Sequence, residues 1–96
     1  MKKDDLIPCH SVHDLSRIEK GDRIYLLEVS ENKDWSIHER LVKKVEIAEE
    51  GDLKGNVLLK LSDGTLLPPY LVWPKFEPLM AALIDMESVG KIIKRK

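Results

Sequence analysis

The sequence predicts an α+β domain: about five strands curl into an antiparallel sheet or small barrel, with a short N-terminal helix before it and a C-terminal packing helix behind it. Three observations predict this fold class. Apolar residues alternate over Trp35–Ile47, Asp63-Gly64 is a hairpin signal, and the apolar residues of Glu77–Gly90 recur at helical spacing. With 96 residues, the chain has room for one modest core, so we expect a single domain over residues 1–96.

The composition is typical of a folded protein, with 43% hydrophobic and 34% charged residues. Sixteen Lys and Arg against seventeen Asp and Glu leave a net charge of −1, which gives no overall field to attract nucleic acid or acidic membranes. One cysteine excludes an internal disulfide and fits a reducing compartment. No apolar stretch follows the charged start or approaches the roughly 20 residues of a membrane helix. We therefore expect a cytoplasmic protein that does not bind membranes.

A short helix is expected over residues 11–21, after a loosely ordered N-terminus (1–10). Ser11 is a good N-cap, Asp14 follows it by three residues, and Gly21 offers a left-handed stop. Residues Asp22–Val29 are apolar on both alternating faces, which predicts a strand buried on most of its surface.

The segment Trp35–Ile47 gives the clearest signal. Five of its seven odd-numbered residues are apolar, against one of its six even-numbered residues, so we expect a long strand that buries its odd face and exposes its even face. Charged residues interrupt the odd face near Glu39–Lys43, which predicts a bend or bulge there.

Short strands are expected at Val57–Leu61, at residues 65–67 and at Tyr70–Trp73, with Pro68-Pro69 ending the second of these. In the C-terminal helix, Pro78 is expected at the first position and Gly90 at the stop. Its apolar face is wide and contains Leu79, Met80, Leu83, Ile84 and Met86. The basic tail, residues 91–96, either adds a strand or frays.

The segments Gly21–Val29, Trp35–Ile47, Asn56–Leu61 and Thr65–Trp73, with the Asp63-Gly64 turn, resemble the small SH3-like β-barrel. The chain also resembles, in style, the small accessory proteins of phages and bacteria. That resemblance implies an inhibitor or regulator that contacts a host protein or a defence protein.

Cys9, His10 and His13 form the one dense group of metal-ligand residue types, and His38 or Asp14 would be needed to complete a zinc site. The usual paired spacing is absent, so a free thiol beside two solvated histidines is the alternative interpretation. No phosphate-binding loop, nucleophile elbow or metal-binding histidine pair is present. We therefore expect neither an enzyme nor a cofactor.

A protein-binding module is the function we expect, because large rigid rings and arginine bury contact area at little entropic cost. The candidate contacts are Trp35, Arg40, Tyr70, Trp73 and Phe76. For each aromatic residue, packing in the core is the alternative. A strand edge left uncovered would also permit a homodimer.

The competing hypothesis is a nucleic-acid-binding barrel. Its contacts would be Arg40, Lys43, Lys44, Lys94, Arg95 and Lys96. The acidic residues Glu39 and Glu46 interleave with the strand part of this set, which is typical of an ordinary solvated sheet face.

Overall fold

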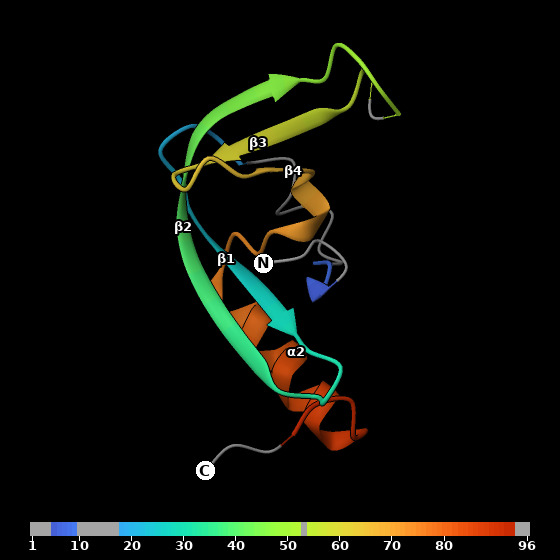
Figure 1. The fold of residues 1–96 in the computed structure, drawn as a ribbon. Helices are drawn as coiled ribbons and strands as arrows, with labels where there is room; N and C mark the ends of the chain where they lie inside the picture. Colours follow the sequence, from blue (N-terminus) through green and yellow to red (C-terminus); the bar gives the residue numbers. More distant parts are fainter. Residues whose placement is uncertain (1–4, 10–17, 53, 94–96) are drawn as a thin grey trace.

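The structure is a computed structural model that describes residues 5–9, 18–52 and 54–93. Its named elements are β1 (Arg23–Val29), β2 (Trp35–Ile47), β3 (Val57–Leu61), β4 (Leu66–Leu67), the 3-10 helix η2 (Pro69–Leu71) and α2 (Phe76–Ser88). The strands form one antiparallel sheet in the order β1-β2-β3-β4 (Figure 1). The predicted α+β class is confirmed. In the described residues, however, the sheet has four strands instead of five, and it is open.

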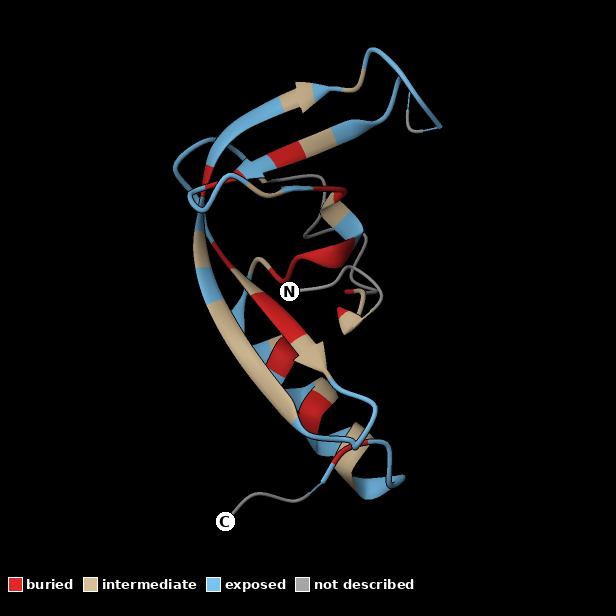
Figure 2. Cartoon of the chain, viewed as in Figure 1, coloured by how far each residue is buried: buried red, intermediate tan, exposed pale blue. Residues whose placement is uncertain are grey.

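Strand β1 is buried on both faces, as its sequence predicts (Figure 2). Ile24 and Leu26 belong to a core cluster shared with β2, β3 and β4. Leu27, on the opposite face, belongs to a second cluster shared with α2. Ile24, Leu26 and Leu27 have no measurable exposure, so β1 joins the two parts of the core.

The outer edge of β1 is covered by two short segments. Tyr25 and Trp73 exchange backbone hydrogen bonds of 2.8 Å in each direction, and the N–H of Ile7 donates to the carbonyl oxygen of Leu27 at 2.8 Å. These bonds satisfy backbone groups that an edge strand would otherwise expose. They also fix residues 5–9, which fall within the predicted loosely ordered N-terminus, against the sheet.

Most of the helix predicted over residues 11–21 lies outside the described residues. Its described end is a turn, in which the N–H of Asp22 donates to the carbonyl oxygen of Glu19 at 3.1 Å. Gly21 has a φ of 93°, a left-handed conformation that glycine adopts without steric cost.

The long strand and the bulge predicted for residues 35–47 are both confirmed. β2 pairs with β1 over residues 35–41 and with β3 from Val42 onward, and the register shifts between Val42 and Lys44. In Figure 1, β2 runs past α2 in its first half and then bends into a projecting hairpin with β3.

The expectation that β2 buries its odd-numbered side chains throughout is wrong. The even-numbered Val42 is 1% exposed, whereas Val45 is 40% and Ile47 is 64% exposed. Val42 precedes the bulge and lies opposite Leu61, a residue of the same core cluster, so the even face of β2 is the buried one at this point. The bulge adds one residue to β2 and so moves the odd-numbered Val45 to this side of the sheet, opposite Leu59. In addition, the hairpin extends past the core, so the apolar residues beyond the bulge are not covered.

The strand predicted at Tyr70–Trp73 is also wrong. Residues Pro69–Leu71 form η2, and among the described residues this segment pairs like a strand through one bridge, between Trp73 and Tyr25. Two consecutive prolines explain the difference, because each fixes φ and neither can donate to a ladder. The Asp63-Gly64 hairpin is confirmed, since it connects β3 to β4 and Gly64 has a φ of 87°.

Helix α2 begins at Phe76, which places Pro78 at its third residue instead of the first. Proline is tolerated there because the first four N–H groups of a helix have no intrahelical acceptor. The predicted stop is confirmed. The N–H of Lys91 donates to Met86 at 2.8 Å and that of Gly90 donates to Glu87 at 3.2 Å, the bond pair of a Schellman motif. Residues 91–93 add no strand, and 94–96 lie outside the described residues.

Candidate functional site

The two tryptophans among the sequence-predicted contacts hold parts of the chain together. Trp73 is 4% exposed, and its indole N–H donates to the carbonyl oxygen of Ile7 at 2.9 Å. Trp35 is half-buried against the α2 cluster and donates to the carbonyl oxygen of Ile93 at 3.2 Å. The Trp73 ring is therefore packed in the core, which leaves none of its faces for a partner.

Arg40 is engaged by acceptors of its own chain. Its Nε lies 3.2 Å from Oδ2 of Asp63, and its Nη1 donates to the carbonyl oxygen of Glu39 at 2.7 Å. Burial raises the pKa of Asp63, but hydrogen bonds from Thr65 and the Arg40 pair outweigh this, so the pKa is lowered below its ordinary value of 3.8. Arg40 therefore stabilises the β3–β4 hairpin.

Tyr70 and Phe76 are the exposed aromatics of the predicted set, at 52% and 44%. Tyr70 lies on η2, where its carbonyl oxygen accepts the N–H of Cys9 at 2.7 Å. Phe76 starts α2, and its ring centroid lies 5.4 Å from that of Tyr25. The structure does not gather the five predicted contacts into one surface.

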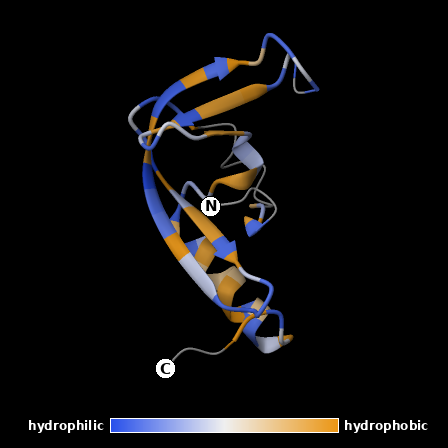
Figure 3. Cartoon of the chain, viewed as in Figure 1, coloured by the Kyte–Doolittle hydropathy of each residue, from blue (hydrophilic) through white to orange (hydrophobic). Residues whose placement is uncertain are grey.

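Phe76 instead belongs to a surface that we call the α2 stripe, defined as Phe76, Met80 and Ile84. These residues are four apart, so they lie in a line along the helix. They are 44%, 38% and 66% exposed, although Leu79 and Leu83 beside them are buried against the sheet. Figure 3 shows apolar residues in several places along α2. The apolar arc of this helix is thus wider than the sheet can cover.

At helical spacing, the α2 stripe lies on the flank of the helix opposite Ala82 and Met86, and we infer from this that it faces the β2 side of the sheet. On the other flank, Ala82 and Met86 line a hollow of about 300 Å³ with Ile7 and Trp73, beyond the outer edge of β1. At the stripe's start, Phe76 contacts Tyr25 of β1.

The first half of β2 leaves one edge open beside this flank. Residues 35–41 pair with β1 only, and no other described strand lies on their far side. The backbone of Leu41 bonds Ser62 on that far side, so by alternation Ile37 and Glu39 direct their backbone groups to the same edge. An apolar helix stripe and an open strand edge therefore occur on one side of the molecule.

A polar cluster that sequence reasoning missed lies on β1 and β2. Oγ of Ser36 lies 3.1 Å from Nε2 of His38, and the same Nε2 lies 3.5 Å from Oε1 of Glu28. A nucleophilic triad needs the two ring nitrogens to face different partners, one the nucleophile and the other the carboxylate. Here both partners meet one nitrogen, so this geometry is not that of a triad. Its sequence signal was the alternation of Ser36 and His38 on one strand face.

The predicted basic and metal-ligand residues are only partly described. Lys44 forms an ion pair with Glu46 at 3.5 Å, and Lys43 is exposed at the bulge. The remaining basic residues of the predicted set lie outside the described residues: Lys94, Arg95 and Lys96. Cys9 is a free thiol and is 3% exposed, while His10 and His13 also fall outside the described part. Within the described part, no group of three or more His, Cys, Asp or Glu residues could hold a metal ion.

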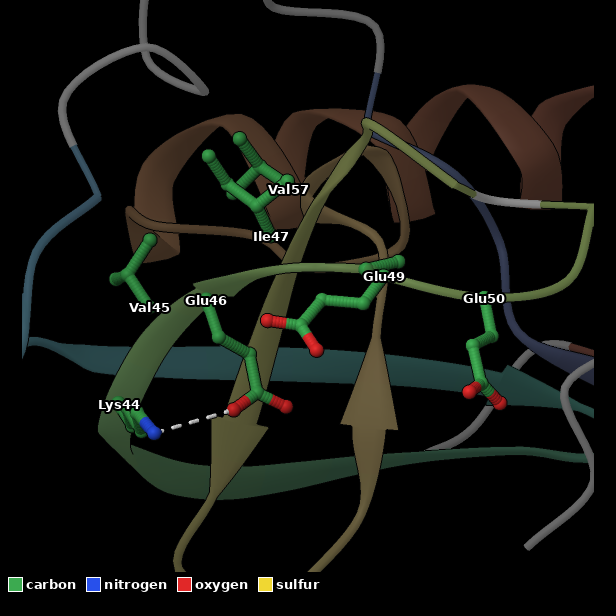
Figure 4. Close-up of a pocket in the computed structure, with 8 residues that line it drawn as sticks. Lys44, Val45, Glu46, Ile47, Glu49, Glu50 and Val57 are labelled. Carbon is green, nitrogen blue, oxygen red and sulfur yellow. Dashed lines mark ion pairs between the residues drawn. The ribbon is translucent and has the colours of Figure 1, made fainter.

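The projecting β2–β3 hairpin has a hollow of about 890 Å³, lined by residues 44–50 and Val57 (Figure 4). The volume is that of a ligand pocket, but a small-molecule site also needs walls that bury most of the ligand. Figure 4 shows Val45, Ile47 and Val57 on one side of the hairpin and the charged side chains on the other. We therefore interpret this hollow as two faces of one ribbon.

None of the helices in the described ranges combines the length and apolar content needed to cross a membrane. Comparisons with protein-family models, with curated proteins and with solved structures give no match to this chain.

Proposed function

We propose that this chain is a small, non-catalytic protein-binding module that contacts its partner through the α2 stripe. One observation carries the proposal: Phe76, Met80 and Ile84 remain exposed in a line while the adjoining apolar residues of the same helix are buried. Lined apolar side chains at helical spacing are the anchors by which a helix packs against another protein. An apolar patch rimmed by polar residues is typical of such contacts.

The open edge of β2 adds to this surface. A partner strand placed beside Ile37 and Glu39 would receive main-chain hydrogen bonds from β2 and apolar contact from the α2 stripe. The partner we expect is therefore an extended or amphipathic segment with large apolar side chains.

The sequence resemblances lead to two more specific hypotheses, one about the fold and one about the biological role. The bridge between Tyr25 and Trp73 returns the chain to β1 after β4, which supports an SH3-like arrangement. The likeness in style to phage and bacterial accessory proteins supports a role as an inhibitor or regulator of a host or defence protein. Binding by the α2 stripe depends on neither of these.

The alternative is a nucleic-acid-binding barrel that uses Arg40, Lys43 and Lys44. Arg40 and Lys44 already contact Asp63 and Glu46, which reduces the counterion release that would drive such binding.

The test compares proteins captured from a lysate of the source cells by the wild type, by Ile84→Asp and by the matched control Ala81→Asp. Ala81 is exposed on another part of α2, so both variants add one carboxylate to the helix surface. We expect a protein that is captured by the wild type and Ala81→Asp and is lost with Ile84→Asp. Identical capture by all three, or recovery of nucleic acid without protein, contradicts the proposal.

A further inference from the structure

The β2–β3 hairpin carries an apolar face beyond the core. Val45 pairs with Leu59, and Ile47 pairs with Val57, so all four side chains point to one side of the sheet. Leu59 is fully buried, whereas Val45, Ile47 and Val57 are 40%, 64% and 41% exposed. We call residues 44–47 and 57–58 the arm.

One edge of the arm has its backbone groups open. Ala48 exchanges hydrogen bonds with the opposite side of the hairpin, donating to Asn56 at 3.0 Å and accepting from Gly55 at 2.8 Å. Backbone groups alternate along a strand, so Lys44 and Glu46 also face β3, while Val45 and Ile47 face the other edge. Among the described residues, no strand pairs with that edge, because β1 pairs with β2 only as far as Leu41.

The charges along this edge complement those of a second copy. If two arms pair antiparallel about a two-fold axis at Val45, each Lys44 lies opposite Glu46 of the other copy. The two Val45 side chains then lie opposite each other, and each Ile47 lies diagonal to Val45 of the other copy. Opposite charges and apolar residues in these positions stabilise strand pairing.

A second copy would also relieve a repulsion within the arm. Lys44 lies directly opposite Lys60, and Glu46 is the acid that contacts Lys44, at 3.5 Å. Like charges that lie opposite each other destabilise a sheet. Glu46 of a second copy would bring another negative charge beside Lys44.

We propose that this edge of the arm joins two copies of the chain into a symmetric dimer, with residues 44–46 paired in the register centred on Val45. The pairing cannot extend to Val42, because the N–H of Val42 already donates to the carbonyl oxygen of Asp22 at 2.9 Å on that edge. An interface this short buries less than about 1,200 Å², so we expect a dissociation constant in the micromolar range or above. The dimer does not depend on the α2 stripe.

Sedimentation equilibrium from about 5 µM to about 500 µM tests the dimer. The wild type is expected to shift toward twice the 11.0 kDa of one chain as concentration rises. Lys44→Glu and Glu46→Lys place like charges opposite each other across the axis, so each weakens the dimer about ten-fold or more. The double variant restores opposite charges and with them the dimer. Lys54→Glu, in the loop at the end of the hairpin, is the charge-matched control and dimerises like the wild type.

A substitution that alters the backbone distinguishes the contribution of the edge's hydrogen bonds from that of its charged side chains. Val45→Pro removes an N–H that faces the open edge and leaves the ladder to β3 intact, so the monomer folds and the dimer is lost. Circular dichroism checks the fold. A wild type that stays monomeric over the whole range overturns the proposal. So does a double variant no better than the single ones, or a dimer that survives Val45→Pro and dissociates with Ile84→Asp.

Discussion

The indole N–H of Trp73 donates a hydrogen bond of 2.9 Å to the carbonyl oxygen of Ile7, a residue 66 positions earlier in the chain. Trp73 also exchanges backbone bonds with Tyr25, while Ile7 donates to Leu27. Residues near the start of the chain and the segment before α2 are thereby fixed to the same edge of β1. This contact makes Trp73 a structural residue and leaves partner binding to the residues on α2.

Trp73→Phe is expected to destabilise the fold by about 1–3 kcal/mol, because the carbonyl of Ile7 loses its donor in a part-buried site and the smaller ring fills less of the core. Urea unfolding measures the change. Tyr70→Phe is the control, since Tyr70 is 52% exposed, and we expect it to change the free energy of unfolding by less than about 0.5 kcal/mol. Equal effects of the two substitutions would contradict the structural role of Trp73.

The burial of the even face of β2 just before the bulge is tested by Val42→Ala and Leu41→Ala. Val42 is 1% and Leu41 is 47% exposed, so the valine substitution, although smaller, should cost about 1–3 kcal/mol and the leucine substitution less than about 1 kcal/mol. Equilibrium unfolding in urea gives both values. A larger loss for Leu41→Ala would mean that β2 buries its odd face here, as the sequence pattern predicts.

Asp63 gives a pH dependence. Its pKa is lowered because the hydrogen bonds from Thr65 and the pair with Arg40 outweigh the effect of burial, so folding favours the ionised carboxylate. The stabilisation is present above the ordinary value of 3.8 and is lost as pH falls through the lower pKa of the folded state. At pH 7 the melting temperature of the wild type should therefore be higher than that of Asp63→Asn, by about 4 °C or less. The difference in melting temperature should disappear below about pH 4. A gap that widens on acidification contradicts this.

The α2 stripe should contribute little to folding if it is a binding surface. Ile84 is 66% exposed and Leu83 is 4% exposed, so Ile84→Ala should cost less than about 1 kcal/mol and Leu83→Ala about 2–5 kcal/mol. Thermal and urea unfolding of the two variants make the comparison. A cost above about 2 kcal/mol for Ile84→Ala would place this side chain in the core.

Local patterns in the sequence were enough to predict the secondary structure that they specify directly. The alternation over residues 35–47 predicts β2, the Asp63-Gly64 pair predicts the β3–β4 hairpin, and Gly90 predicts the end of α2. Each depends on a backbone preference of the residues themselves. The bulge was also predictable, from the charges that interrupt the odd face of β2.

What the sequence could not predict depends on contacts between distant segments. The burial of Val42 and the exposure of Val45 and Ile47 depend on where the core ends, which the sequence pattern does not show because a period of two is the same for both faces. The α2 stripe had a signal in the wide apolar face with Met80 and Ile84. Which part of that face the sheet leaves exposed depends on the packing of Leu79 and Leu83. The sequence predicts Trp73 as a contact because a sequence pattern does not distinguish a buried ring from an exposed one.

The role of the α2 stripe is tested by the affinity of the captured partner for the wild type, Ala81→Asp and Ile84→Asp, measured by isothermal titration calorimetry at low and moderate salt. We predict equal dissociation constants for the first two proteins, at least about ten-fold weaker binding by Ile84→Asp, and little change with salt. Equal affinity for Ile84→Asp and wild type would contradict the α2 stripe as the binding surface. Binding that weakens steeply with salt would point instead to a contact made by charged groups.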